Sequence, residues 1–312
     1  MVYVGETSVV GFGYESTFKT KATSIDKIFG QGTRITTINI KNNVERIYNI
    51  GARVAQQLAA LRFEGSWSVE AYLSNNDWMK LALGKETEIT NTAGTVTGYT
   101  YEVGNDVISA TIEIGMTSGG SNLVRDLLGA IVRRWTLDCR VNEIVTVRLD
   151  GAYATESVST PTALPSYTLD YGNVMTFVDG SVQLPTGTTV AKVQEISLDV
   201  DTGATNIFSI GDRTAVDKYG RNYEISGKMS VVAEDPTMLE YALGVGASGA
   251  TSPASGVTEI TAEIKFDNGT NSCIIDLSGL SIEGISNRLE ANEIVIWDVD
   301  FVARDIKITW NL

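Results

Sequence analysis

The sequence contains no histidine, only two cysteines, and no apolar run near the roughly 18 residues that a membrane helix needs. Without histidine there is no Ser-His or Cys-His pair and no imidazole ligand for a metal. Cys139 and Cys273 lie far apart and outside any CxxC pair, so we expect two reduced, buried thiols. We therefore predict that the chain is not an enzyme, uses no cofactor or metal, and has no membrane partner.

Basic residues are also scarce. The chain has 24 Lys+Arg against 38 Asp+Glu, a net charge of −14. The imbalance lies in the second half, since residues 1–156 carry a net −2 and residues 157–312 a net −12. An acidic surface repels phosphates, which disfavours a DNA-binding role. The first ten residues lack the basic flank and apolar stretch of a signal peptide, so we expect folding in the cytoplasm of the producing cell.

The five prolines all follow residue 160, and Pro161 and Pro165 lie in the segment STPTALPS. Proline stiffens an extended connector and cannot donate to a strand ladder. We therefore predict a linker over residues 159–172 that separates a first domain, residues 1–158, from a second domain, residues 173–312.

The two predicted domains repeat one another. The segment IYNIGAR (47–53) matches IFSIGDR (207–213) at an offset of 160, and the helix end Ala-Leu-Gly at 82–84 recurs at 242–244 with the same offset. Later matches share an offset of 150, as NEIV at 142–145 and again from residue 292. Several matches in one order predict a tandem duplication. The change of offset places ten extra residues in the first copy.

Strand patterns dominate each copy. EISLDVD (195–201) and TTINIK (36–41) alternate apolar and polar residues, the period of a half-buried strand. One short helix closed by glycine is predicted per copy, DWMKLALG (77–84) and PTMLEYALG (236–244). In the second, we expect Asp235 to cap the helix, Pro236 to be its first helical residue and Leu239 to lie on its apolar side. Segment 124–134 fits either a helix or a strand. The predicted fold is mainly β, with two tandem barrel or sandwich domains that each carry one flanking helix.

The most informative repeated polar features are the glycine and arginine of the two IG-x-R segments. The glycine can serve a tight turn, and the arginine can pair either with a carboxylate of its own copy or across a subunit boundary. Both interpretations stay open. The candidate structural or interface residues are Gly51, Arg53 and Glu64 in the first copy and Gly211, Arg213 and Glu224 in the second.

With the repeat laid out, the chain resembles the tail tube proteins (major tail proteins) of tailed bacteriophages and archaeal viruses. The resemblance rests on VGETSVVGFGYESTF (4–18), on the IG-x-R segment followed by EGSWSVEAYLSNNDWMKLALG (64–84), and on ISGKMSVVAEDPTMLEYALG (225–244). It covers most of both copies but contains no catalytic signature.

The resemblance implies a virion structural protein whose β domains form rings that stack into the hollow tail tube. Because this chain carries two copies, we expect trimeric rings with pseudo-sixfold symmetry. Expected partners are the terminator, distal tail and tape measure proteins. Viral DNA would pass during ejection without specific binding, and assembly would occur in the host cytoplasm. An acidic lumen would repel DNA, and the polar residues Glu195, Asp199 and Asp201 are candidates for its surface.

Divergence between the copies suggests a division of roles. The Thr- and Gly-rich segment 85–128, which holds the ten extra residues, is the expected place for contacts between rings or for surface decoration. Two alternatives stay open: the inner tube of a contractile tail or injection machine, and a β-sandwich capsid decoration protein or adhesin.

Overall fold

A computed structural model describes residues 9–118, 121–167, 171–190, 192–234, 236–244, 248–288 and 294–312. Some residues named above lie outside the described ones. They are the expected helix cap Asp235, residues 292–293 of the second NEIV segment, residues 4–8 of the N-terminal motif and residues 168–170 of the predicted linker. The fold is mainly β with two short helices, as predicted. Segment 124–134 is part of a strand.

The first half contains β1 (Val9–Tyr14), β2 (Gln31–Ile47), β3 (Gln57–Tyr72), α1 (Asp77–Leu83), β4 (Gly84–Thr90), β5 (Val96–Val103), β6 (Ala110–Ser118), β7 (Ser121–Arg140), β8 (Thr146–Tyr153) and β9 (Thr155–Ser159). The second half contains a 3-10 turn (Phe177–Asp179), β10 (Gly180–Gln183), β11 (Val193–Asp201), β12 (Thr205–Ile207), β13 (Asp217–Tyr219), β14 (Glu224–Val232), α2 (Thr237–Leu243), β15 (Ile260–Asp267), β16 (Ser272–Arg288), β17 (Ile296–Ala303) and β18 (Asp305–Asn311).

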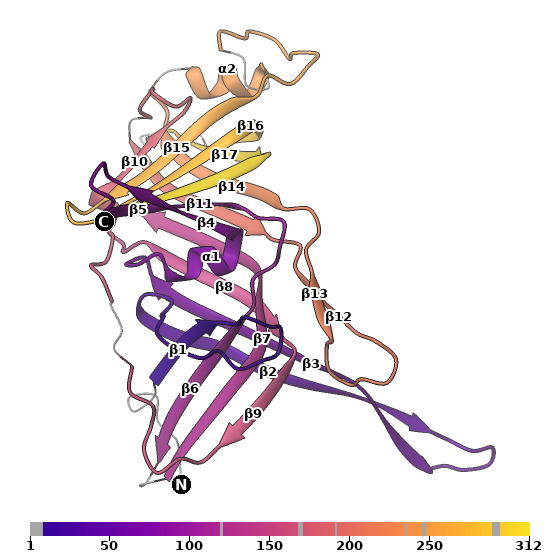
Figure 1. Ribbon diagram of the computed structural model, residues 1–312. Coiled ribbons are helices and arrows are strands. Elements are labelled where there is room, and N and C mark those ends of the chain that lie inside the picture. Colours follow the sequence, from indigo (N-terminus) through magenta and orange to yellow (C-terminus); the bar gives the residue numbers. More distant parts are fainter. Residues whose placement is uncertain are drawn as a thin grey trace.

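A single run of eight strands crosses the whole molecule in the order β2-β3-β8-β7-β11-β14-β17-β16, and we call it the eight-stranded sheet. Its first four strands come from the first half and its last four from the second (Figure 1). The long strands β7 and β16 continue into further ladders, β1-β6-β7-β9 and β10-β15-β16-β18. The predicted domain boundary falls between β9 and β10, but the two halves share one sheet.

The long strands bend where they pass from one ladder to the next. Gly129 in β7 has φ of +65°, and Gly279 in β16 has φ of +62°. Residues with a side chain rarely adopt a positive φ, so glycine is required at both bends. These glycines are 150 residues apart, the offset of the later sequence matches.

The first part of each half pairs in the same register at an offset of 160. Ile38 in β2 lies opposite Trp67 in β3. Leu198 in β11 lies opposite Gly227 in β14. Adding 160 to each member of the first pair gives the second pair. The strands β2 and β11 therefore occupy equivalent places.

The last part of each half pairs in the same register at an offset of 150. Trp135 in β7 lies opposite Leu149 in β8, and Ile285 in β16 lies opposite Val299 in β17. A register shift occurs between Val132 and Arg134 in β7 and again between residues 282 and 284 in β16. The strands β7 and β16 therefore have the same pairing and the same register shift, 150 residues apart.

The core lies on the apolar face of the eight-stranded sheet and is continuous between the halves. Trp135 of β7 packs edge-on against Trp78 of α1, with ring centroids 5.3 Å apart. Both rings are fully buried, which explains why so short a helix is stable here. In α2, Met238 and Tyr241 are buried, but Leu239, expected on the apolar side, is 42% exposed.

The two helices end differently although both end at an Ala-Leu-Gly sequence. Gly84 has φ of +90°, the left-handed cap that the sequence predicts. Gly244 has φ of −79° and stays in the helical region. Pro236 stands at the cap position of α2 rather than at its first helical residue. Among the described residues, no helix is long and apolar enough to cross a membrane.

The ten extra residues of the first half lie around the hairpin formed by β4 and β5. Strand β5 pairs with β18, so this hairpin extends the sheet of the second half. Residues 110–118 and 121–128 also belong to sheet strands, β6 and β7. Much of segment 85–128 therefore belongs to strands of the sheets.

Candidate assembly interface

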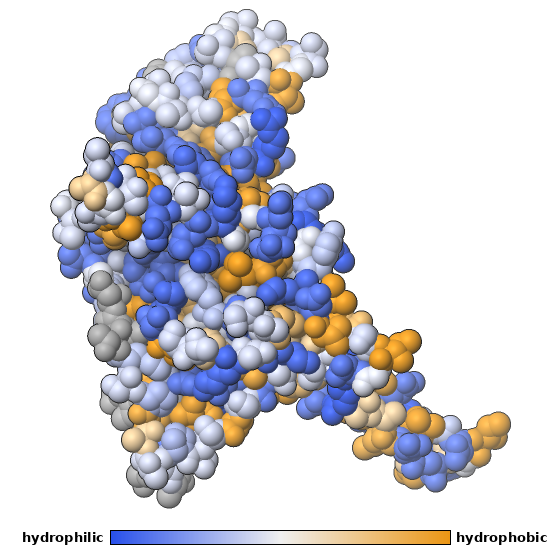
Figure 2. Space-filling model, in the orientation of Figure 1, coloured by the Kyte–Doolittle hydropathy of each residue, from blue (hydrophilic) through white to orange (hydrophobic). Residues whose placement is uncertain are grey.

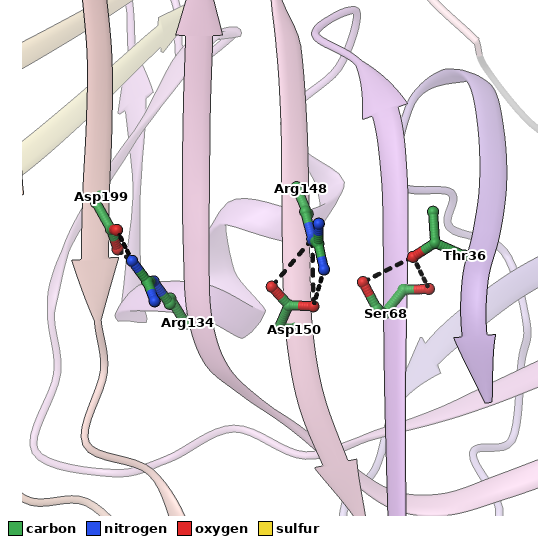
Figure 3. Close-up of polar contacts among 6 residues, drawn as sticks. All are labelled: Thr36, Ser68, Arg134, Arg148, Asp150 and Asp199. Carbon is green, nitrogen blue, oxygen red and sulfur yellow. Dashed lines mark hydrogen bonds and ion pairs between the residues drawn. The ribbon is translucent and has the colours of Figure 1, made fainter. Parts of the chain in front are cut away.

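The polar face of the eight-stranded sheet, opposite the core, is lined by alternating charged and hydroxyl side chains. Figure 3 shows Arg134 of β7 with Asp199 of β11, Arg148 with Asp150 within β8, and Thr36 beside Ser68 of β3. The alternation predicted for residues 195–201 is confirmed, because Ile196, Leu198 and Val200 are buried on the other face.

The two halves meet at the ladder between β7 and β11, which we call the junction ladder. It is antiparallel, and it runs from Arg140 opposite Glu195 to Arg134 opposite Asp201. On the apolar face, Trp135 lies opposite Val200, and both are fully buried. Backbone pairing and apolar burial therefore join the halves into one sheet.

Two ion pairs cross the junction ladder on the polar face. Arg134 Nε donates to Asp199 Oδ1 at 2.7 Å, and Arg140 Nη2 lies 2.7 Å from Glu195 Oε1. These hydrogen bonds raise the pKa of the Arg134 and Arg140 guanidinium groups above the ordinary value for arginine. Each pair joins a basic residue of the first half to an acidic residue of the second.

The three residues expected to form an acidic surface all lie on this polar face. Glu195 and Asp199 are compensated by the arginines of the junction ladder. Asp201 Oδ1 accepts a hydrogen bond from the Gly203 amide at 2.8 Å, at a turn. The second half also places Glu224, Lys228, Asp298 and Asp300 on this side, and Glu283 lines a hollow with Asp199 and Asp300. The second half therefore gives the polar face an excess of carboxylates.

Sequence reasoning missed Arg134 and Arg140. Both project from a strand whose first part could not be distinguished from a helix by its pattern. The signal was present in β7, where Arg134, Thr136 and Asp138 alternate with buried residues.

The eight-stranded sheet ends in two strands that each have one free edge along the sheet. Among the described residues, strand β2 pairs only with β3, and residues 281–288 of β16 pair only with β17. Ile40 of β2 is 45% exposed although its equivalent Val200 is fully buried. Exposed strand edges with apolar side chains are places where sheets associate.

Two hairpins project from the same side of the molecule (Figure 1). The first hairpin, residues 42–62, is the outer part of β2 and β3, and the second hairpin, residues 202–222, contains β12 and β13. Gly51 has φ of +84° and Gly211 has φ of +102°, as tight turns require. Ile50 and Ile210 precede these glycines and are fully exposed. Apolar surface is visible along the first hairpin in Figure 2.

Arg213 fastens the second hairpin to the flank of the first. Its Nε donates to the Leu61 carbonyl at 2.9 Å, and its Nη2 donates to Asn42 Oδ1 at 3.1 Å. The Phe63 amide donates to the carbonyl of Arg213 at 2.7 Å. Arg213 thus contacts the other half of the chain, not the Glu224 of its own half.

Arg53 has no ion pair among the contacts found in the described part of the chain. Its expected partner Glu64 instead binds Arg62 at 2.6 Å, Lys41 at 3.6 Å and the Asn43 amide at 3.0 Å. The Asn43 hydrogen bond, with the two cations, lowers the pKa of Glu64. The structure therefore does not bring Arg53 and Glu64 together, and Arg53 stays exposed on the first hairpin.

Comparison with known proteins agrees with this architecture. A family model described as phage tail tube protein matches residues 5–303. No curated protein matches the chain. The match spans nearly the whole sequence, including both halves, both hairpins and the junction ladder. The chain belongs to the phage tail tube protein family, a family of virion structural proteins and not of enzymes.

Proposed function

We propose that this tail tube protein assembles into rings of three chains, which stack into the hollow tube that viral DNA crosses during ejection. The junction ladder carries the proposal. It joins the β7 edge of one half to the β11 edge of the other, and the free edges of the chain, β16 and β2, are equivalent to those two. A contact between unlike edges repeats head to tail, and it closes into a ring when the rotation permits.

The ring would contain six equivalent positions filled by three chains. We interpret residues 1–158 and 173–312 as duplicated tube domains joined by the linker 159–172. The equal registers of β2 with β3 and β11 with β14 support this interpretation, as do those of β7 with β8 and β16 with β17. Symmetry would then be threefold for chains and close to sixfold for domains.

The polar face of the eight-stranded sheet is the proposed wall of the lumen. Its opposite face is buried in the core, so only the polar face is free to meet passing DNA. Carboxylates of the second half and the compensated arginines of the junction ladder leave few free cations to bind phosphates.

The two hairpins provide the proposed contacts between chains and between rings. Arg213 already bonds across the boundary between halves. By the offset of 160, Arg53 of one chain would reach the carbonyl of Arg221 in the neighbouring chain. Gly51 and Gly211 shape the two turns, and the exposed Ile50 and Ile210 at their tips suit apolar contact with the next ring.

The remaining parts of the proposal concern location and partners. Membership in the family places the protein in the virion tail. Assembly in the host cytoplasm, and contacts with terminator, distal tail and tape measure proteins at the ends and inside of the tube, follow from that role.

Electron microscopy of the purified full-length chain tests the proposal. Negative staining across a range of protein and salt concentrations is expected to show stacked rings or long tubes. A chain that stays strictly monomeric at high concentration in every condition would contradict the proposal.

A further inference from the structure

The internal junction predicts how a second copy of the chain docks. In the junction ladder, Asp199 lies opposite Thr136, and Val200 lies opposite Trp135. The equivalent residues follow from the two register offsets, 160 back for β11 and 150 forward for β7.

We infer that β2 of one copy pairs antiparallel with β16 of the next copy, with Asn39 opposite Ser286 and Ile40 opposite Ile285. This inference rests on the proposed ring and adds to it the residue-level register of the contact. The occupant of both free edges is a second copy of this chain, because the chain already contains the same pairing between its own halves.

Apolar side chains at the two edges support the register. At the junction ladder the corresponding pair, Trp135 and Val200, is fully buried. At the free edges Ile40 is 45% exposed and Ile285 is half-buried. Pairing in the inferred register would bring these two side chains together over the core and remove both from water.

Charge and space on the polar face fit the same register. Lys41 of one copy would lie opposite Gly284 of the other. A Cβ added at Gly284 would have only Asp300 Oδ2 within 4 Å, at 3.9 Å, so the polar face is open directly above this glycine. Glu283 and Asp300 line the hollow at this edge. Lys41, which lies 3.6 Å from Glu64 of its own copy, would approach carboxylates of the β16 edge, of which Asp300 lies 3.3 Å from Lys228.

The charged residues at the inferred contact differ from those at the junction ladder. The junction ladder has Arg134 opposite Asp201. The inferred ladder has Lys41 opposite a glycine, with the carboxylate one strand farther away. A β2 edge that approached β7 instead would place Lys41 against Arg134. Like charges at that position would discriminate against the wrong pairing.

Disulfide cross-linking measures the register directly. In the double variant Asn39→Cys/Ser286→Cys, the two new thiols of a single chain lie at opposite ends of eight strands, about 34 Å apart at about 4.8 Å per strand spacing. A disulfide needs Cβ atoms about 3.5–4.5 Å apart, so any bond must join two chains. Both positions are exposed in the isolated chain.

The native cysteines do not interfere with this measurement. Burial raises the pKa of the Cys273 thiol to about 12, and burial with nearby carboxylates raises that of Cys139 to about 11. Neither thiol forms the reactive thiolate near neutral pH. The unmodified chain and the two single-cysteine variants serve as background controls.

A matched control moves each new cysteine by two residues. The variant Thr37→Cys/Gly284→Cys carries the same number of thiols on the same two strands. In the inferred register its thiols would be four residues apart along the strands, about 13 Å at about 3.3 Å per residue. A second in-register variant, Lys41→Cys/Gly284→Cys, replaces the first if that one fails to fold by circular dichroism.

The assembled variants are oxidised with copper phenanthroline and run on non-reducing gels. We expect Asn39→Cys/Ser286→Cys to give covalent dimers and trimers that dithiothreitol reverses, and the matched control to stay monomeric. Rings that form without in-register cross-links, or with cross-links in the matched control, would overturn the register but leave the tube function standing. Absence of any ring by microscopy would overturn both.

Discussion

At the scale of single residues, the ion pairs of the polar face matter for the charge of the surface more than for stability. Arg134 and Arg140 are more than half exposed, and ion pairs between exposed side chains contribute little to stability. Their effect is electrostatic, because each arginine is compensated by Asp199 or Glu195 and presents no free cation to DNA.

Neutralising these two carboxylates should expose the arginines. We expect the variant Glu195→Gln/Asp199→Asn to bind a dye-labelled oligonucleotide at low salt, because two uncompensated guanidinium groups then face solvent. Binding should weaken steeply as salt rises. Fluorescence anisotropy of the oligonucleotide measures it.

The control variant removes the same charge elsewhere. Asp212→Asn/Asp217→Asn changes two exposed carboxylates of the second hairpin, away from the polar face. If both variants bind the oligonucleotide equally, the compensation of the polar face plays no part in keeping DNA unbound.

Residue-level prediction from the sequence succeeded where a local rule applied. Period-two alternation placed Ile196, Leu198 and Val200 on the buried face. The sequence left open whether Arg53 and Arg213 pair with a carboxylate of their own copy or across a boundary. Their contacts depend on how the hairpins lie against each other, which no local pattern contains.

At the scale of elements, the two hairpins are equivalent in sequence but not in surroundings. The second hairpin leans on the flank of the first through Arg213. The first hairpin extends away from the body of the molecule (Figure 1). In the proposed ring, the first hairpin would make the equivalent contact with another chain.

Alanine substitution at the two arginines should separate these situations. We expect Arg53→Ala to leave the isolated chain unchanged but to reduce tube formation, since Arg53 makes no ion pair with the described residues of its own chain. We expect Arg213→Ala to loosen the second hairpin, because three hydrogen bonds at Arg213 join it to residues 42 and 61–63.

Two measurements distinguish the variants. Hydrogen exchange of the Phe63 amide reports the contact with Arg213, and sedimentation reports tube formation. Arg53→Ala tubes that sediment like the unmodified protein, or an Arg53→Ala chain with a lowered melting temperature, would argue against an interface role for Arg53.

The helices show how far an element can be predicted. Both were found from a cap-to-glycine pattern, and both exist within a residue or two of the expected bounds. The packing was predictable only for α1, whose Trp78 is buried against β7. In α2 the exposed Leu239 shows that apolar spacing alone does not determine which side faces a sheet.

At the scale of the whole molecule, the fold class could be predicted, but the connection between halves could not. Alternation and offset matches need only the sequence. The pairing of β7 with β11 and of β5 with β18 joins strands far apart in the chain. The alternation of apolar and polar residues in a strand is the same whichever strand pairs with it, so it does not identify the neighbour. These long-range pairings join two predicted domains into one sheet.

The central claim is that three copies of this chain, each supplying two tube domains, close into one ring of the tail tube. Cryo-electron microscopy of the assembled protein, viewed end-on along the tube, tests it most directly. The account predicts a ring of six lobes of two alternating kinds, with threefold symmetry and three chains. A ring built from six whole chains, or a protein that forms no ring, would contradict it.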